Sequence, residues 1–112
     1  MRIVNRTEFL DMPAGTVFNK WKPCYFEHPC IKGDTWNHCQ DFLVQYLDGL
    51  RYEDGEKSMD PELRLEDGQE CPMDFDMMSR DGCFDDDQLF AVWSDADVEA
   101  LIVRLQNRKA TA

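Results

Sequence analysis

The chain lacks the features that mark several large classes of protein. No run of about 18 apolar residues occurs, so we expect no segment to span a membrane. The first eight residues carry a charge every few positions and contain no apolar stretch, so we expect no secretory signal peptide and a cytoplasmic location. There is no P-loop and no Gly-x-Gly-x-x-Gly motif. Basic stripes are missing too, and we expect no direct binding to nucleic acid.

What is present fits one small domain. The 112 residues are one domain's worth, and an apolar fraction of 43% suffices for one modest core. The chain has no low-complexity tract and no internal repeat, so we expect a single domain over residues 1–112.

Negative charge is concentrated in one part of the chain. The formal net charge is −11, from 23 acidic and 12 basic residues. Residues 1–47 hold five of each sign and residues 88–112 hold three of each, whereas residues 48–87 hold fifteen acidic and four basic side chains. The whole excess therefore lies in one segment. A segregated excess creates a directional field that attracts basic surfaces and repels nucleic acid.

Capping and alternation patterns predict an α+β fold. Asn5, with Glu8 three residues later, predicts a short helix over residues 5–11. Clusters of β-branched and aromatic residues predict strands at 16–21, 25–26 (closed by Pro29), 42–47 and 89–93. Within the third of these strands, Phe42, Val44 and Tyr46 share one face, which is expected to point inward.

The C-terminal part predicts an amphipathic helix. Ser94 has the character of an N-cap, and the helix is expected over residues 95–107. Its apolar stripe is expected to pack on a small, mostly antiparallel sheet, so that an aspartate at Leu101 unfolds the domain. The stripe consists of Val98, Leu101, Ile102 and Leu105.

The acidic segment is punctuated by Asp-Gly pairs. Because Asp-Gly favours the positive φ angles of tight turns, these pairs predict turns, some of them with short strands alongside, for example near Leu63 and Leu65. The four pairs are Asp48-Gly49, Asp54-Gly55, Asp67-Gly68 and Asp81-Gly82.

Two groups of side chains have the composition of a metal site. Within 16 residues lie Cys24, His28, Cys30, His38 and Cys39. Their spacing matches no common zinc module, and we interpret the thiols as small apolar side chains, reduced and without disulfides. The same residues contain two pairs that could support catalysis by a cysteine nucleophile, Cys24 with His28 and Cys39 with His38. Neither pair is flanked by a Gly-rich or helix-start element that would activate a thiolate. The aspartates from Asp74 onward depart from the EF-hand order, since Ser79 stands where its glycine would be. We expect no cofactor and no catalysis.

The acidic segment is instead interpreted as a binding face. A rigid array of carboxylates can compete for a basic groove that otherwise holds the phosphates of DNA. The candidate partner-binding residues are Glu66, Asp67, Glu70, Asp74, Asp76, Asp81, Asp85, Asp86 and Asp87. Apolar residues that could add anchors are interleaved with them: Tyr52, Met59, Met73, Phe75, Met77, Met78 and Phe84.

Several segments resemble short proteins encoded by bacteriophages and prophages. They are residues 5–10, 12–18, 31–35, 80–82 and 88–93, together with the helix start at Asp97-Val98. These patterns cover about a quarter of the chain and are typical of a fold rather than of a catalytic site. The resemblance implies a class that includes inhibitors of host defence, among them anti-CRISPR proteins and DNA mimics, acting in the host cytoplasm. It carries over no functional residue.

The leading hypothesis is thus a non-enzymatic protein that binds and inhibits a host protein through an acidic face. One alternative is a protein that sequesters a small molecule or nucleotide, with Arg2, Lys20, Lys22 and Lys32 as candidate phosphate ligands. A further alternative is a metal-dependent enzyme that uses the aspartate cluster. The oligomeric state stays open.

Overall fold

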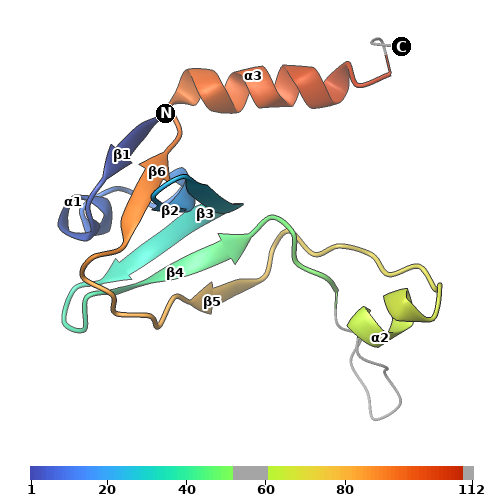
Figure 1. Ribbon diagram of the computed structural model, residues 1–112, viewed down its shortest axis with the longest axis horizontal. Coiled ribbons are helices and arrows are strands. Elements are labelled where there is room, and N and C mark those ends of the chain that lie inside the picture. Colours follow the sequence, from blue (N-terminus) through green and yellow to red (C-terminus); the bar gives the residue numbers. More distant parts are fainter. Residues whose placement is uncertain (52–60, 110–112) are drawn as a thin grey trace.

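The computed structural model describes residues 1–51 and 61–109, which form a six-stranded sheet and three helices (Figure 1). In chain order the elements are β1 (Arg2–Val4), α1 (Arg6–Leu10), β2 (Val17–Lys22), β3 (Tyr25–Trp36), β4 (Asp41–Tyr46), α2 (Pro61–Glu66), β5 (Met78–Arg80), β6 (Leu89–Val92) and α3 (Asp95–Gln106). The strands are ordered β1-β6-β2-β3-β4-β5, and every neighbouring pair is antiparallel. The predicted α+β class is confirmed.

Capping residues explain where α1 and α3 begin. The Asn5 side chain accepts a hydrogen bond from the Glu8 backbone N–H at 2.9 Å. At α3, the Ser94 hydroxyl accepts from Asp97 N–H while the Asp97 carboxylate accepts from Ser94 N–H, both at 3.1 Å. This capping box satisfies two backbone donors that the first turn would otherwise leave unpaired.

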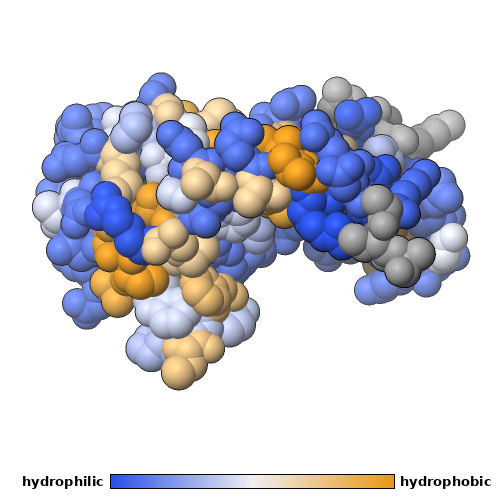
Figure 2. Space-filling view, turned by 90° about the horizontal axis from the view of Figure 1, so that it is seen from above, coloured by the Kyte–Doolittle hydropathy of each residue, from blue (hydrophilic) through white to orange (hydrophobic). Residues whose placement is uncertain are grey.

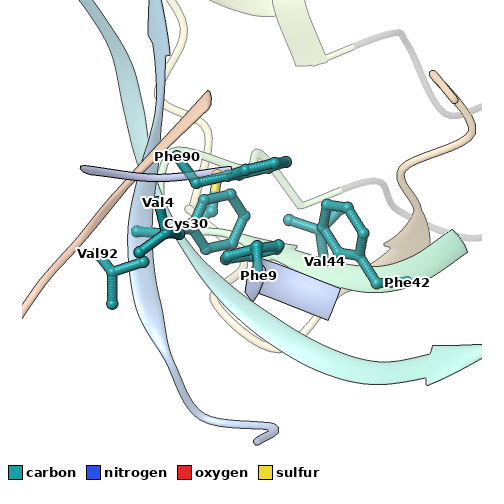
Figure 3. Packing of buried hydrophobic residues seen from close by; sticks show 8 residues of the cluster. Val4, Phe9, Cys30, Phe42, Val44, Phe90 and Val92 are labelled. Atoms are coloured by element: carbon teal, nitrogen blue, oxygen red, sulfur yellow. The ribbon is translucent and has the colours of Figure 1, made fainter. Parts of the chain in front are cut away.

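The hydrophobic core lies between α1 and one face of the sheet. Phe9 from α1 is fully buried and stacks on Phe90 of β6, with ring centroids 4.0 Å apart (Figure 3). Phe18 and Phe42 make edge-to-face contacts with the Phe9 ring, with ring centroids 4.7 and 5.1 Å from it. These edge-to-face and stacked contacts are geometries that aromatic quadrupoles favour. The inward face predicted for residues 42–47 is confirmed, since Phe42 and Val44 are buried and Tyr46 packs against the cluster.

The second predicted strand is much longer than residues 25–26. β3 continues past Pro29, which has no N–H to donate to a neighbouring strand. The β2–β3 register shifts between Asn19 and Trp21, directly beside Pro29, and the Asn19 side-chain amide donates to the Glu27 carbonyl at 2.6 Å. A bulge is where a sheet tolerates proline. Strands β1 and β5, of three residues each, were not predicted.

The Asp67-Gly68 pair ends a helix rather than forming a hairpin turn. The short strands expected near Leu63 and Leu65 are wrong, because both residues belong to α2. Gly68 has φ of +79°; its N–H donates to the Leu65 carbonyl, and Gln69 N–H donates to Arg64, in the pattern of a Schellman motif. The predicted Asp54-Gly55 turn and the residues Tyr52 and Met59 lie outside the described residues.

The C-terminal helix forms where predicted, but it does not lie on the sheet. None of the α3 residues is buried, and Figure 1 shows the helix leading away from the end of β6. Leu101, Ile102 and Leu105 are 39%, 42% and 54% exposed. The first turn is held in place by the N-terminal ammonium of Met1, which donates to the Asp97 carboxylate at 2.7 Å. Among the described residues, no helix combines the length and apolarity required to cross a bilayer.

Candidate functional site

Residues 61–87 form one margin of the molecule, which we call the acidic edge. They comprise α2, the segment that leads to β5, β5 itself and the loop to β6. β5 is the outermost strand on this side of the sheet, and α2 and the β5–β6 loop lie beyond its two ends (Figure 1). These 27 residues hold ten acidic and two basic side chains.

Eight of the nine candidate residues have exposed or half-buried side chains on this edge. Glu66, Asp67 and Glu70 are exposed at and after the end of α2, and Asp85, Asp86 and Asp87 are exposed in the loop before β6. Between these two patches lie Asp74, half-buried, and Asp76, exposed. The acidic side chains therefore form two patches at the ends of β5, joined by a sparser stretch, rather than one compact cluster.

Local hydrogen bonds fix the loops that carry these carboxylates. The Asp74 carboxylate accepts from Asp76 N–H at 2.9 Å, and the Asp85 carboxylate accepts from Asp87 N–H at 3.0 Å. Each is an Asx-turn, in which the side chain closes the turn of its own backbone. The repeated Asp-x-Asp spacing thus orders the loops while it supplies charge.

The loop before β5 is also fastened to the chain that follows β4. Asp74 N–H donates to Gly49 O at 2.8 Å, and the Gln45 side-chain amide donates to the Phe75 carbonyl. A Cβ at position 49 would lie 2.9 Å from the Asp74 carbonyl oxygen, so only glycine permits this approach. The glycine of the Asp48-Gly49 pair therefore serves close packing.

Asp81 is the exception among the candidate residues. Its side chain is 1% exposed, whereas a partner-binding carboxylate has to reach the surface. It lies 2.5 Å from Lys20 Nζ and 3.7 Å from an Arg6 guanidinium nitrogen. Burial alone would lower the pKa of Lys20, but the hydrogen bond and charge of Asp81 outweigh it and raise that pKa. Asp81 therefore neutralises two cations of the neutral half of the chain.

A second buried carboxylate anchors β5. Asp41 of β4 is 0% exposed and accepts from Arg80 Nε at 2.9 Å, Gly82 N–H at 3.0 Å and Phe42 N–H at 2.9 Å. Burial alone would raise the pKa of Asp41, but these hydrogen bonds outweigh it and hold the pKa below its ordinary value. The Arg80 guanidinium also lies over the Trp36 ring, 4.8 Å from its centroid. No sequence signal singled out Asp41 or its pairing with Arg80.

Large apolar side chains are exposed between the carboxylates of the acidic edge. Besides Leu63 and Leu65 of α2, five of the residues expected to act as anchors are 43% to 50% exposed: Met73, Phe75, Met77, Met78 and Phe84. Sequence reasoning left open which of the interleaved apolar residues belong to the core, and none of these five does. The edge therefore presents apolar contact area together with negative charge.

The cysteine and histidine residues are spread along β3 rather than gathered. Cys24 lies in the β2–β3 turn with φ of +66°, and His38 and Cys39 lie at the far end of the twelve-residue strand, in the turn to β4. Cys30 is buried in the core, where burial raises the pKa of its thiol to about 12. His28 contacts Asp48 at 3.0 Å. Within residues 1–51 and 61–109, no three His, Cys, Asp or Glu side chains are grouped so as to hold a metal ion.

The cavity that Lys20 lines and the groove that Arg2 lines each contain no second member of the four basic residues of the nucleotide-binding alternative. Arg2 pairs with Glu8 at 2.6 Å, and Lys20 pairs with Asp81. Lys32 is 1% exposed and donates to the Gly33 carbonyl and to Thr35 Oγ1, and burial lowers its pKa. The cavity beside Lys20 has a volume of about 50 Å³, well below the roughly 300 Å³ at which ligand pockets begin.

Comparison of the chain with family models, with curated proteins and with solved structures found no match for it.

Proposed function

We propose that this protein is a non-enzymatic interaction protein that binds a basic surface of another protein through its acidic edge. In the phage setting that the sequence resemblance suggests, the partner is a host protein, and a nucleic-acid-binding defence complex of the CRISPR-Cas type fits the chemistry. Occupying the basic groove of such a complex would inhibit it by DNA mimicry.

The observation that carries this proposal is the mixture of carboxylates and exposed apolar side chains on one edge. Charge alone keeps a loop solvated, and it does not account for five methionine and phenylalanine side chains that are about half exposed among the carboxylates. Apolar patches rimmed by polar residues are typical of interaction surfaces. Protein interfaces combine aromatic and methionine anchors with a polar, charged rim. Methionine is also suited to surfaces of varied shape, because its side chain is flexible and polarisable.

The shape of the edge favours an elongated partner surface. Figure 1 shows α2 and the β5–β6 loop, which carry the two acidic patches, at opposite ends of β5, in a molecule that measures 42 × 42 × 25 Å. Duplex DNA carries one phosphate charge per about 1.7 Å of its axis, so a groove that binds it presents cations over a comparable length. Two patches joined by an apolar stretch would meet such a groove at both ends and in the middle.

The first experiment removes charge without changing shape. The variant Asp85→Asn/Asp86→Asn/Asp87→Asn loses three charges, and Asp11→Asn/Glu27→Gln/Asp34→Asn loses the same number outside the edge. Immobilised wild-type protein is used to capture nuclease-treated bacterial lysate at low and high salt, and captured proteins are identified by mass spectrometry. Association rates of the purified partner are then measured for wild type and both variants.

We expect the edge variant to associate at least about 10-fold more slowly at low salt, with the control close to wild type, because summed fields act mainly on encounter. The difference should shrink in 1 M salt, where the screening length is about 3 Å. Duplex DNA should compete for the captured partner. If the two variants behave alike, Asp85–Asp87 is a solvated loop. If charge reversal at the other exposed candidate carboxylates of the edge, Glu66, Asp67, Glu70 and Asp76, also leaves the association rate unchanged, the proposal fails.

The second experiment tests the apolar anchors. Phe75→Ala should weaken the complex by at least about 1 kcal/mol, mostly through faster dissociation, if Phe75 is buried against the partner. Tyr25→Ala is the matched control, since Tyr25, the first residue of β3, is 59% exposed and lies outside the edge. Equal effects of the two substitutions would contradict a role for the edge in binding.

A further inference from the structure

Within residues 1–51 and 61–109, most of the apolar stripe of α3 is exposed. Val98 is half-buried, and Leu101, Ile102 and Leu105 are between 39% and 54% exposed. Figure 2 views the molecule from above relative to Figure 1, the side on which α3 lies, and shows hydrophobic surface patches among hydrophilic ones. The stripe has the i, i+3, i+4, i+7 spacing of a helix that packs along one face.

A helix of this length needs a packing partner. α3 has 12 residues, and isolated helices below about 12–15 residues are marginal in water, since most helical stability in proteins comes from packing of the apolar face. The capping box and the Met1–Asp97 ion pair stabilise only its first turn. In the part of the chain that the structure describes, α3 therefore lacks most of the packing that stabilises a helix of this length.

The charges of α3 are arranged to complement a second copy running in the opposite direction. Asp95, Asp97 and Glu99 lie in its first half, and Arg104 lies in its last turn. Arg108 and Lys109 follow directly. In an antiparallel pair, the acidic end of each helix lies beside the basic end of the other, and the apolar stripes face each other. A parallel pair would place like charges together at both ends.

The surface beside the start of α3 offers room for the other helix's basic end. A groove of about 410 Å³ lies between the first turn of α3 and the segment that connects α1 to β2. Its apolar lining includes Met12, Val17 and Val98. Its two charged lining residues are Asp95 and Arg2, and the Arg2 charge is paired with Glu8. An antiparallel helix would bring its C-terminal turn, with Leu105 and Arg104, toward this groove.

We propose that α3 pairs antiparallel with α3 of a second copy, so that the chain forms a two-fold symmetric homodimer. Each helix is about 18 Å long at 1.5 Å per residue, so the interface is small and the groove beside each first turn contributes to it. The two-fold axis crosses the middle of the helix pair, and each contact therefore occurs twice. The acidic edge lies on the side of the sheet away from α3 (Figure 1) and stays accessible in this dimer. The proposal does not rest on the function proposed above.

Sedimentation velocity over about 1 µM to about 1 mM, the range in which small interfaces dissociate, tests the dimer. We expect the mass to rise from 13.1 kDa toward twice that value. Leu105→Asp should raise the dimer dissociation constant at least about 10-fold, whereas Leu105→Met should leave it nearly unchanged. Circular dichroism at the lowest concentration checks that each variant is folded. A mass that stays at the monomer value throughout, or a Leu105→Asp variant that dimerises as wild type does, overturns the proposal.

Charge reversal tests the antiparallel direction. Asp95→Lys/Glu99→Lys makes both ends of α3 basic, and Arg104→Glu/Arg108→Glu makes both ends acidic. Each variant alone should dimerise less than wild type, and an equimolar mixture should recover dimer as a heterodimer. Glu66→Lys/Glu70→Lys changes the net charge as much as the first variant but lies at α2, and should not weaken association. A mixture that stays monomeric while both single variants are folded overturns the antiparallel pairing.

Discussion

Replacing Asp81 with asparagine should destabilise the fold strongly, although its neighbours in the acidic segment tolerate the same change. The Asp81 side chain is 1% exposed and lies 2.5 Å from Lys20 Nζ and 3.7 Å from Arg6. Asparagine keeps the shape but leaves two largely buried cations without a counter-charge. Asp86 is exposed in the following loop, so Asp86→Asn removes a charge that water already screens.

The expected size of the effect follows from the burial of the three partners. Removing one member of a buried ion pair costs about 3–5 kcal/mol. The asparagine carbonyl still accepts one hydrogen bond and the Lys20 side chain is 18% exposed, so we expect about 2–4 kcal/mol within that mechanism. This is a large share of the roughly 5–15 kcal/mol that stabilises an ordinary domain. For Asp86→Asn we expect less than about 0.5 kcal/mol.

Urea unfolding of both variants, followed by tryptophan fluorescence at low micromolar concentration, measures the two free energies. A double-mutant cycle with Lys20→Met isolates the Asp81–Lys20 interaction, because removing both partners should cost less than the sum of the single changes. If Asp81→Asn and Asp86→Asn agree within about 0.5 kcal/mol, Asp81 is as solvated as its neighbours and the assignment of a structural role is refuted.

Three further predictions concern stability and reactivity. Leu101→Asp should change the free energy of unfolding of the single chain by less than about 0.5 kcal/mol, because Leu101 is 39% exposed; a loss of several kcal/mol in urea unfolding would show that α3 packs on the sheet. The lowered pKa of Asp41 contributes stability that is fully present above its ordinary value of 3.8 and is lost as pH falls through the folded-state pKa; acid titration of wild type and Asp41→Asn should reveal that step only in wild type. With a thiol reagent near pH 8, the exposed Cys24 and Cys83 should react quickly, whereas Cys30, with a pKa of about 12, should react only on unfolding.

The parts of the fold that could be predicted from sequence are those set by neighbouring residues. Asn5 and Ser94 each accept a hydrogen bond from the backbone N–H three positions later, so these residues indicate the starts of α1 and α3. The alternation of Phe42, Val44 and Tyr46 likewise reports a strand with one buried face. These signals are local, and the structure confirms them.

Helix α2 was missed although local signals for it exist. Pro61 is its first residue and Gly68 stands just past its end, which is the asymmetry that helices favour. The prediction instead took Asp67-Gly68 as the signal of a hairpin turn. A glycine with positive φ occurs both in hairpin turns and at the C-terminal ends of helices, so the pair does not distinguish the two. Six residues also give too few turns for a periodic apolar pattern to decide between helix and strand.

The packing of α3 was not predictable from its amphipathic pattern. An apolar stripe predicts that one face of a helix is buried, but it does not identify the surface against which that face packs. The prediction assumed that the sheet covers this stripe, because a sheet offers a large apolar face. In the structure the capping box and the Met1 ammonium fix the first turn of α3, and its stripe is left exposed.

The same limit explains why the acidic segment divides into two kinds of carboxylate. Asp81 and Asp85 each precede a turn, and the side chain of each accepts a hydrogen bond from the backbone N–H two residues later. Only Asp81 meets cations from elsewhere in the fold, because β2 brings Lys20 and α1 brings Arg6 to it from more than 60 positions away. Net charge along the sequence therefore overstates the charge available for binding. The exposed remainder, interleaved with half-exposed phenylalanine and methionine side chains, is what a basic partner would contact.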